Sequence, residues 1–192
     1  MPQRSSALDR SAAAVRAGVG AFADLGLSSA AVRRAADDVG VSSAYLFRLF
    51  GSQRDYFLAC LDHVEERMLA TLAGAAVVPD EDALGPLGGA FRQFAADGSV
   101  SGLWLQACAV ARDDAEIARR CRQIMAGGLA AAAATGAPRE RLGEFLARGA
   151  LVMTLQAVGA DLRVGSEGAV AALLREFVDE PGTPGAAVED SA

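Results

Sequence analysis

The sequence predicts an all-α protein. Apolar residues recur every three or four positions through nearly all of the chain, a spacing that places them on one face of a helix. No stretch of useful length alternates between apolar and polar residues, as a half-buried β-strand would. Of the 192 residues, 52% are hydrophobic and 22% are charged, which is the balance of a folded globular protein rather than of a disordered chain.

Residues 1–52 are expected to contain three helices. The first has an apolar stripe that runs from Leu8 to Phe22. The second and third are short, and Gly40 separates them, because glycine easily adopts the left-handed backbone found at helix C-termini. The residues predicted to cap or end these helices are Ser28 or Ser29, Ser42, Gly26 and Gly51.

The chain beyond residue 52 is also predicted to be helical. Ser52, followed by Asp55, resembles a capping box that opens a long fourth helix ending near Leu72. A proline and three acidic residues within 74–82 predict a break after this helix. Further helices are expected at residues 83–97, 101–111, 114–134, 138–163 and 167–179. The proline, glycine and acidic content of residues 181–192 predicts a disordered tail.

The charges are distributed unevenly around a net charge of −6. Residues 1–57 contain seven arginines and five aspartates, whereas residues 58–192 contain eleven arginines and nineteen acidic residues. Any surface that binds an anion is therefore expected in the first third of the chain. There is no lysine, so every fixed positive charge is a guanidinium, a group suited to paired contacts with phosphates or bases.

Membrane and export signals are not evident in the sequence. The longest weakly polar run, residues 149–160, is shorter than the roughly 20 residues that span a bilayer. The N-terminus has no apolar signal segment, so we expect a cytoplasmic protein with no membrane partner.

The three cysteines, Cys60, Cys108 and Cys121, are expected to be reduced and mostly buried. Cys60 and His63 are three residues apart, but two ligands do not make a metal site. Redox sensing by Cys108 or Cys121 stays open as an alternative role.

A known motif lies in the first third of the chain. Two short helices joined at Gly40, with a helix before and after, form a helix-turn-helix arrangement, whose second short helix enters the major groove of DNA. The stretch "AFADLGLSSAAVRRAADDVGVSSAYLFRLFGSQRDYF", residues 21–57, resembles the DNA-binding domain of TetR-family transcriptional repressors. The positions that match the family pattern without a gap are Phe22, Gly26, Leu27, Val32, Ala36, Gly40, Val41, Ser42, Leu46, Phe47, Phe50 and Ser52.

This resemblance implies a DNA-binding domain at 1–52 and a helical ligand-binding and dimerisation domain at 53–180. The implied protein is a homodimer that binds a double-stranded DNA operator and is released by a small, largely apolar effector. The residues expected to contact DNA are Ser29, Arg33, Ser42, Ser43, Ala44, Tyr45, Phe47, Arg48, Gln53 and Arg54. The sequence departs from the family at Phe47, where the family has a phosphate-binding tyrosine, and at Gln53, where it has a lysine.

Side chains of the third helix are expected to divide between core and DNA. Leu46 and Phe50 should point inward. Tyr45, in the first turn, should reach base edges, with packing on a neighbouring helix as the alternative. Arg48 should bind phosphate, and Arg33 is favoured over Arg34 for contact with the DNA backbone.

Bulky apolar residues on several helices of the second part are expected to line an effector pocket, with a plain core role as the alternative. The predicted pocket residues are Phe91, Phe94, Trp104, Cys108, Met125, Met153 and Gln156, and Gln106 is a further candidate for a polar contact. The residues expected at the dimer interface, by the family resemblance, are Leu146, Gly149, Ala150, Leu173, Leu174 and Phe177.

Two other classes of function are compatible with a helical chain of this size. An enzyme would need a nucleophile with its base, a phosphate loop or clustered metal ligands, and the sequence, with one histidine, has none of these patterns. We therefore expect no catalytic residues, no metal and no cofactor. The stronger alternative is a helical adaptor whose first domain binds a protein instead of DNA. Activation in place of repression also stays open.

Overall fold

The computed structural model describes residues 7–75 and 84–179, and every regular element within these ranges is helical, which confirms the predicted class. The elements are α1 (Ala7–Leu25), α2 (Ser29–Val39), α3 (Ser43–Phe50), α4 (Gln53–Ala75), α5 (Gly85–Ala95), α6 (Gly98–Val110), α7 (Ala115–Ala133), α8 (Arg139–Ala157), the 3-10 helix η1 (Leu162–Val164) and α9 (Gly165–Asp179). The predicted tail, 181–192, and residues 76–82 of the predicted break lie outside the described residues.

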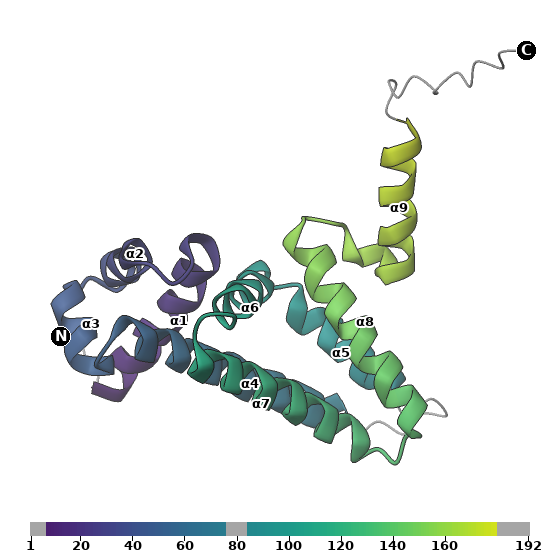
Figure 1. Ribbon diagram of the computed structural model, residues 1–192, viewed down its shortest axis with the longest axis horizontal. Helices are drawn as coiled ribbons and strands as arrows, with labels where there is room; N and C mark the ends of the chain where they lie inside the picture. Colours follow the sequence, from purple (N-terminus) through teal and green to yellow (C-terminus); the bar gives the residue numbers. More distant parts are fainter. Residues whose placement is uncertain (1–6, 76–83, 180–192) are drawn as a thin grey trace, which may run out of the picture.

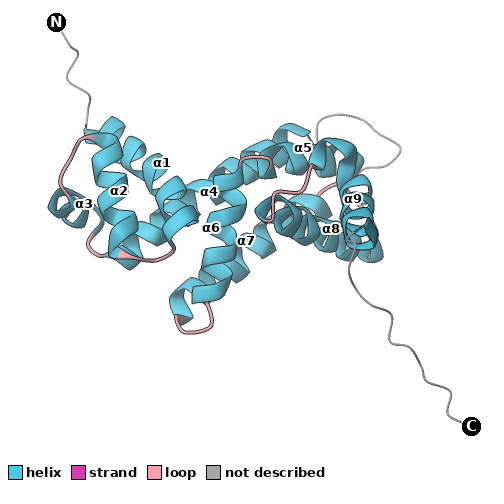
Figure 2. Ribbon diagram, turned by 90° about the horizontal axis from the view of Figure 1, so that it is seen from above, coloured by secondary structure: helices cyan, strands magenta, loops and turns pink. Residues whose placement is uncertain are grey.

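The molecule is elongated, with α1, α2 and α3 at one end and α5, α8 and α9 at the other (Figures 1 and 2). The long helix α4 connects the two ends, and it packs against α1 and α3 as well as against α5 and α7. Helix α6 lies between the ends and packs closely against α1. The last helix, α9, projects from the body and packs mainly against α8 and η1 among the described elements (Figure 1).

Short-range hydrogen bonds fix the boundaries of α2 and α3 as the sequence predicts. The hydroxyl of Ser28, rather than that of Ser29, caps α2 by accepting a 3.2 Å hydrogen bond from the N–H of Ala31. Ser42 caps α3 in the same way, at 3.2 Å from the N–H of Tyr45. Gly40 has a φ of 69°, in the left-handed region where a side chain would be strained. The turn between the two helices is therefore specified by its own residues.

Aromatic side chains from three helices form the core beneath α3. The ring of Phe22 packs edge-on against Tyr56 and Phe57, with centroid distances of 5.1 and 5.2 Å. Phe50 stacks on Tyr56 at 4.3 Å, and Leu46 is only 1% exposed. The inward direction predicted for Leu46 and Phe50 is confirmed. The first turns of α4 thus complete the core of the three N-terminal helices and hold α3 in a fixed orientation.

The helix predicted at 138–163 is wrong at its C-terminal end. The α8 helix stops at Ala157, and Gly159, with a φ of 77°, turns the chain toward η1. The carboxylate of Asp161 then caps η1 by accepting a 3.0 Å hydrogen bond from the N–H of Arg163. Apolar residues continue at helical spacing through this turn, as at Val158, so periodicity alone did not reveal the break.

Candidate functional site

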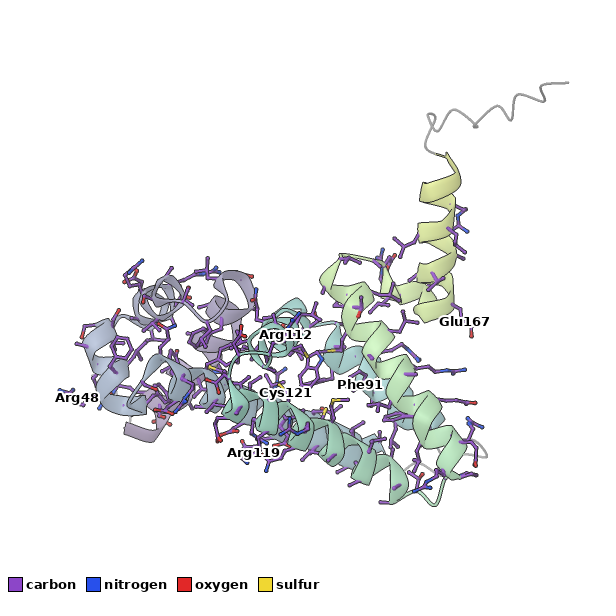
Figure 3. All side chains as sticks on the ribbon, viewed as in Figure 1. Arg48, Phe91, Arg112, Arg119, Cys121 and Glu167 are labelled. Carbon is purple, nitrogen blue, oxygen red and sulfur yellow. The ribbon has the colours of Figure 1, made fainter. Side chains whose placement is uncertain are left out.

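Helix α3 lies at the tip of the molecule, with one face on the core and the other exposed. Arg48 is exposed on the side opposite Leu46 and points away from the body (Figure 3). Ala44 is exposed beside it, and Phe47 is 40% exposed. Since this helix is eight residues long and exposed along its outer side, it has the size and position to enter a major groove.

Tyr45 occupies a position between these two faces. Its ring is half-buried and packs against the core, which is the alternative that the sequence left open. The guanidinium of Arg48 lies over the same ring, 5.2 Å from its centroid. The ring of Tyr45 therefore packs against both the core and the guanidinium of Arg48, and it remains partly exposed to solvent.

Residues outside α3 extend its outer surface. The hydroxyl of Ser29 donates a 3.3 Å hydrogen bond to the side-chain oxygen of Gln53, which joins the start of α2 to the start of α4. Arg33 is exposed and has no ion-pair partner among the described residues. Its neighbour Arg34 is paired with Asp24 at 2.6 Å. Of these two arginines, Arg33 is thus the one available to a phosphate.

Arg54, offered by the sequence as a substitute for a missing lysine, is partly engaged within the protein. Its guanidinium lies 3.8 Å from the carboxylate of Asp114. Asp114 also caps α7, because it accepts hydrogen bonds of 3.0 and 3.1 Å from the N–H groups of Glu116 and Ile117. Arg54 therefore has to leave or share this partner in order to bind DNA.

A second feature, an apolar cavity of about 110 Å³, lies between the helices of the second part. Five of the seven predicted pocket residues line it, namely Phe91, Phe94, Trp104, Met125 and Met153. Its other lining residues are Val64, Met68, Leu72, Val100, Ile124, Gly128, Leu129, Phe145, Leu146, Gly149 and Ala150. All of these side chains are uncharged, so the cavity favours an apolar occupant.

The remaining predicted pocket residues lie elsewhere. Cys108 is exposed on α6 and shares a hydrogen bond with the thiol of Cys121 on α7. The amide of Gln156 donates a 3.3 Å hydrogen bond to the carbonyl of Ala96, at the end of α5. Gln106 lies against Gly26, in the turn after α1. None of these positions could be told from the sequence, because each lies one turn or less from a residue that does face the cavity.

The predicted dimer residues divide into two groups. Leu146, Gly149 and Ala150 line the apolar cavity, whereas Leu173 and Leu174 are exposed on α9. The side chain of Phe177 is outside the described part of the structure. A different row of residues, along α8 and at its C-cap, is exposed to solvent and carries no charge: Gly143, Ala147, Leu151, Thr154 and Val158.

Hydrogen bonds and ion pairs between helices, which the sequence did not predict, hold α7 against α4. The guanidinium of Arg120 is mostly buried and pairs with both Asp62, at 2.5 Å, and Glu65. The described residues include no group of three side chains suited to hold a metal ion. Within the same ranges, no helix is both long and apolar enough to cross a membrane.

Comparison with known proteins supports the fold. No protein-family model and no curated protein sequence matches the chain. Three solved structures superpose over most of it. The fatty acid degradation regulator FadR from Bacillus halodurans is 18% identical, with a TM-score of 0.64 over 85% of this chain and 97% of its own. A regulator from Rhodococcus sp. assigned to the TetR family is 20% identical, with a TM-score of 0.62 over 86% and 95%.

The third is a TetR-like transcriptional regulator from Rhodococcus sp. RHA1, 18% identical, with a TM-score of 0.61 over 92% of this chain and all of its own. Identities this low establish the architecture and not the partners of the chain. The helix-turn-helix at the tip and the helical domain behind it therefore belong to one known architecture: the chain has the fold of TetR-family transcriptional regulators.

Proposed function

We propose that this protein is a DNA-binding transcriptional repressor that acts as a homodimer and is released by a small molecule. The observation that carries the proposal is the position of α3 at the tip, with Arg48 directed outward and, on α2, Arg33, which has no ion-pair partner in the part of the chain that the structure describes. Residues 1–52 would bind DNA and residues 53–180 would bind the effector and the second subunit, with the start of α4 shared between the two. Two copies of α3 would enter successive major grooves about 34–36 Å apart.

The exposed apolar surface of α8 and α9 supports the homodimer. Val158 is 68% exposed, and Leu151 on the same face of α8 is 39% exposed. Leu174 on α9 is also largely exposed, and α9 itself has few neighbours in a single chain (Figure 1). A second copy that pairs its α8 and α9 with these helices would remove this apolar surface from water.

Helix α6 provides a physical connection between the effector cavity and the DNA-binding end. Trp104 and Val100 of α6 line the cavity. Gly102, between them, lies so close to α1 that an added β-carbon would be 2.9 Å from the β-carbon of Ala23. A ligand that moves α6 would therefore move α1 as well. Such a ligand causes release from DNA only if its affinity differs between the dimer arrangement that fits DNA and the arrangement that does not.

The proposal is tested by measuring affinity for random duplex DNA over a salt series from about 50 to about 200 mM. A DNA-binding protein releases counterions from the phosphates, so the logarithm of its affinity should fall linearly with the logarithm of salt concentration. A flat response, or no binding at the lowest salt, would instead favour the adaptor that binds a protein partner. The variant Arg48→Gln, with Arg139→Gln as a matched surface control on α8, should weaken binding while the control does not.

A further inference from the structure

A second cavity, also of about 110 Å³, adjoins the apolar one between α5 and α8. Its lining residues are Leu84, Gly85, Gly88, Phe91, Arg92, Arg141, Glu144, Phe145, Arg148, Gly149 and Val152. We call it the arginine groove because three of these residues are arginines. The two cavities share Phe91, Phe145 and Gly149, so they are separated by a single layer of residues.

The arginine groove has an excess of positive charge. Arg141 is paired with Glu144 at 3.2 Å. Arg92 and Arg148 are exposed and form no ion pair with any described residue. Two guanidinium groups from facing helices are thus available at this end of the site. The apolar cavity, in contrast, has no charged side chain in its lining.

Phe91 forms the wall between the two cavities. Its ring lies against the backbone of Gly149, where an added β-carbon would be 3.4 Å from the Cε1 atom of the ring. Phe91 is half-buried and lies near the meeting of α5 and α8 (Figure 3). The side chains of Phe91 and Phe145 line both cavities, so a ligand that reaches from one cavity to the other has to displace or pass beside these two rings.

We propose that the effector is an amphiphilic anion, with an apolar body in the cavity and a carboxylate held by Arg92 and Arg148. This inference rests on the proposed effector function and narrows its chemical class. The size of the cavity limits the body, since a cavity of roughly 150 Å³ binds benzene. A volume of about 110 Å³ is smaller, so the cavity would hold a short stretch of alkyl chain, and the rest of the molecule would extend toward the arginine groove. A carboxylate beside Arg92 and Arg148 would offset part of the positive charge of the arginine groove, which an uncharged molecule cannot do.

The chain contains its own reporter for this site. Trp104 is the single tryptophan of the protein and it lines the apolar cavity, so a change in its fluorescence reports occupation there. The experiment titrates the full-length protein with octanoate and, separately, with 1-octanol, which has the same chain length and no charge. We expect both to alter the Trp104 emission and octanoate to bind more tightly.

The arginines are tested with the double variant Arg92→Gln/Arg148→Gln. In this variant the octanoate carboxylate loses its ion pairs with both arginines. Octanoate binding should therefore weaken roughly threefold to tenfold, while 1-octanol binding should not change. Arg139→Gln is the matched control, because Arg139 is exposed on the same helix and lies outside both cavities. It should leave both affinities unchanged.

Three results would overturn the inference: equal affinity for octanoate and 1-octanol, an unchanged octanoate affinity in the double variant, or no binding of either ligand to the unaltered protein. The DNA salt series, repeated on the same preparation, separates these failures from that of the proposed function. Salt-dependent DNA binding combined with any of the three results removes the amphiphilic anion and leaves the DNA-binding regulator standing.

Discussion

The guanidinium of Arg48 lies over the ring of Tyr45, 5.2 Å from the ring centroid, on the outer face of α3. An exposed contact of this kind between a cation and an aromatic ring contributes about 0.5–1 kcal/mol. We assign base contact to Tyr45 and phosphate contact to Arg48. These two side chains therefore already interact with each other before DNA is bound.

Substitutions at these two residues should change DNA binding in different ways. Arg48→Ala is expected to weaken binding to all sequences about equally, whereas Tyr45→Ala should also alter the preference at one base position. Because Tyr45 supports Arg48, the double variant should lose less affinity than the sum of the two single losses. The measurement is the affinity for a selected operator and for duplexes changed at single base pairs. Tyr45→Phe is the control that keeps the ring and removes the hydroxyl. A uniform loss from both single variants would contradict base contact by Tyr45.

Arg33→Gln should weaken DNA binding more than Arg34→Gln. The guanidinium of Arg34 is held by Asp24 at 2.6 Å, whereas that of Arg33 has no ion-pair partner among the described residues. Loss of one phosphate contact should reduce the salt slope of binding by about one. The two variants carry the same chemical change at adjacent positions, so each is the control for the other. Equal slopes, both lower than that of the unaltered protein, would show that the Asp24 pair opens when DNA binds, whereas two unchanged slopes would show that neither arginine contacts a phosphate.

The sequence predicted the structure of α2 and α3 well because it depends on local interactions. Ser42 and Gly40 fix the ends of helices through contacts within a few residues, and Leu46 lies inside because of its spacing from Phe50. Such relations can be derived from residue type and position alone. Which arginine is free could not be derived in this way, because the Arg34–Asp24 pair joins residues on two different helices.

The second part was predicted less completely for a related reason. Helix α8 has small or apolar residues on two faces, and periodicity does not show which of them turns inward. Gly149 and Ala150 line the cavity, while Leu151 is exposed on the face proposed to bind a second copy. The choice between these faces depends on how α8 packs against α5 and α6, which involves residues far apart in the chain.

Gly102→Ala should destabilise the protein. An added β-carbon would lie 2.9 Å from the β-carbon of Ala23 and 3.4 Å from its Cα, so α1 and α6 would have to separate. Overpacking at such a contact costs about 1–3 kcal/mol of the free energy of unfolding. Urea denaturation measures this change. Gly98→Ala on the same helix is the matched control, since nothing lies within 4 Å of the added carbon. Equal stability of the two variants would show that α1 and α6 separate at little cost.

Cys108 should be the thiol that reacts first with iodoacetamide. The hydrogen bond from Cys121 lowers the pKa of Cys108 to about 7. Burial raises the pKa of Cys60, and the hydrogen bond with Cys108 is the main cause that raises the pKa of Cys121. The thiolate is the reactive form, so the alkylation rate at Cys108 should rise with pH and be half-maximal near pH 7. Peptide mass spectrometry at several pH values measures this rate for each cysteine.

The control for this assignment is Cys121→Ala. Without the hydrogen bond from Cys121, the midpoint of Cys108 alkylation should move up toward the ordinary thiol value of about 8.5. An unchanged midpoint in the variant would mean that the Cys121 thiol does not set the reactivity of Cys108.

The outward face of α8 is the surface that we expect a second copy of the chain to cover. If a second copy covers Leu151 and Val158, then Leu151→Glu/Val158→Glu places four carboxylates into a symmetric interface and should convert the dimer to monomers. Sedimentation measures the change in mass, and affinity for a selected operator should fall because each monomer contacts only one half-site. Leu105→Glu on α6 is the control, since Leu105 is 38% exposed, about as much as Leu151, but lies on a different helix. A double variant that stays dimeric and binds the operator normally would exclude this face of α8, and the interface would then have to be sought elsewhere.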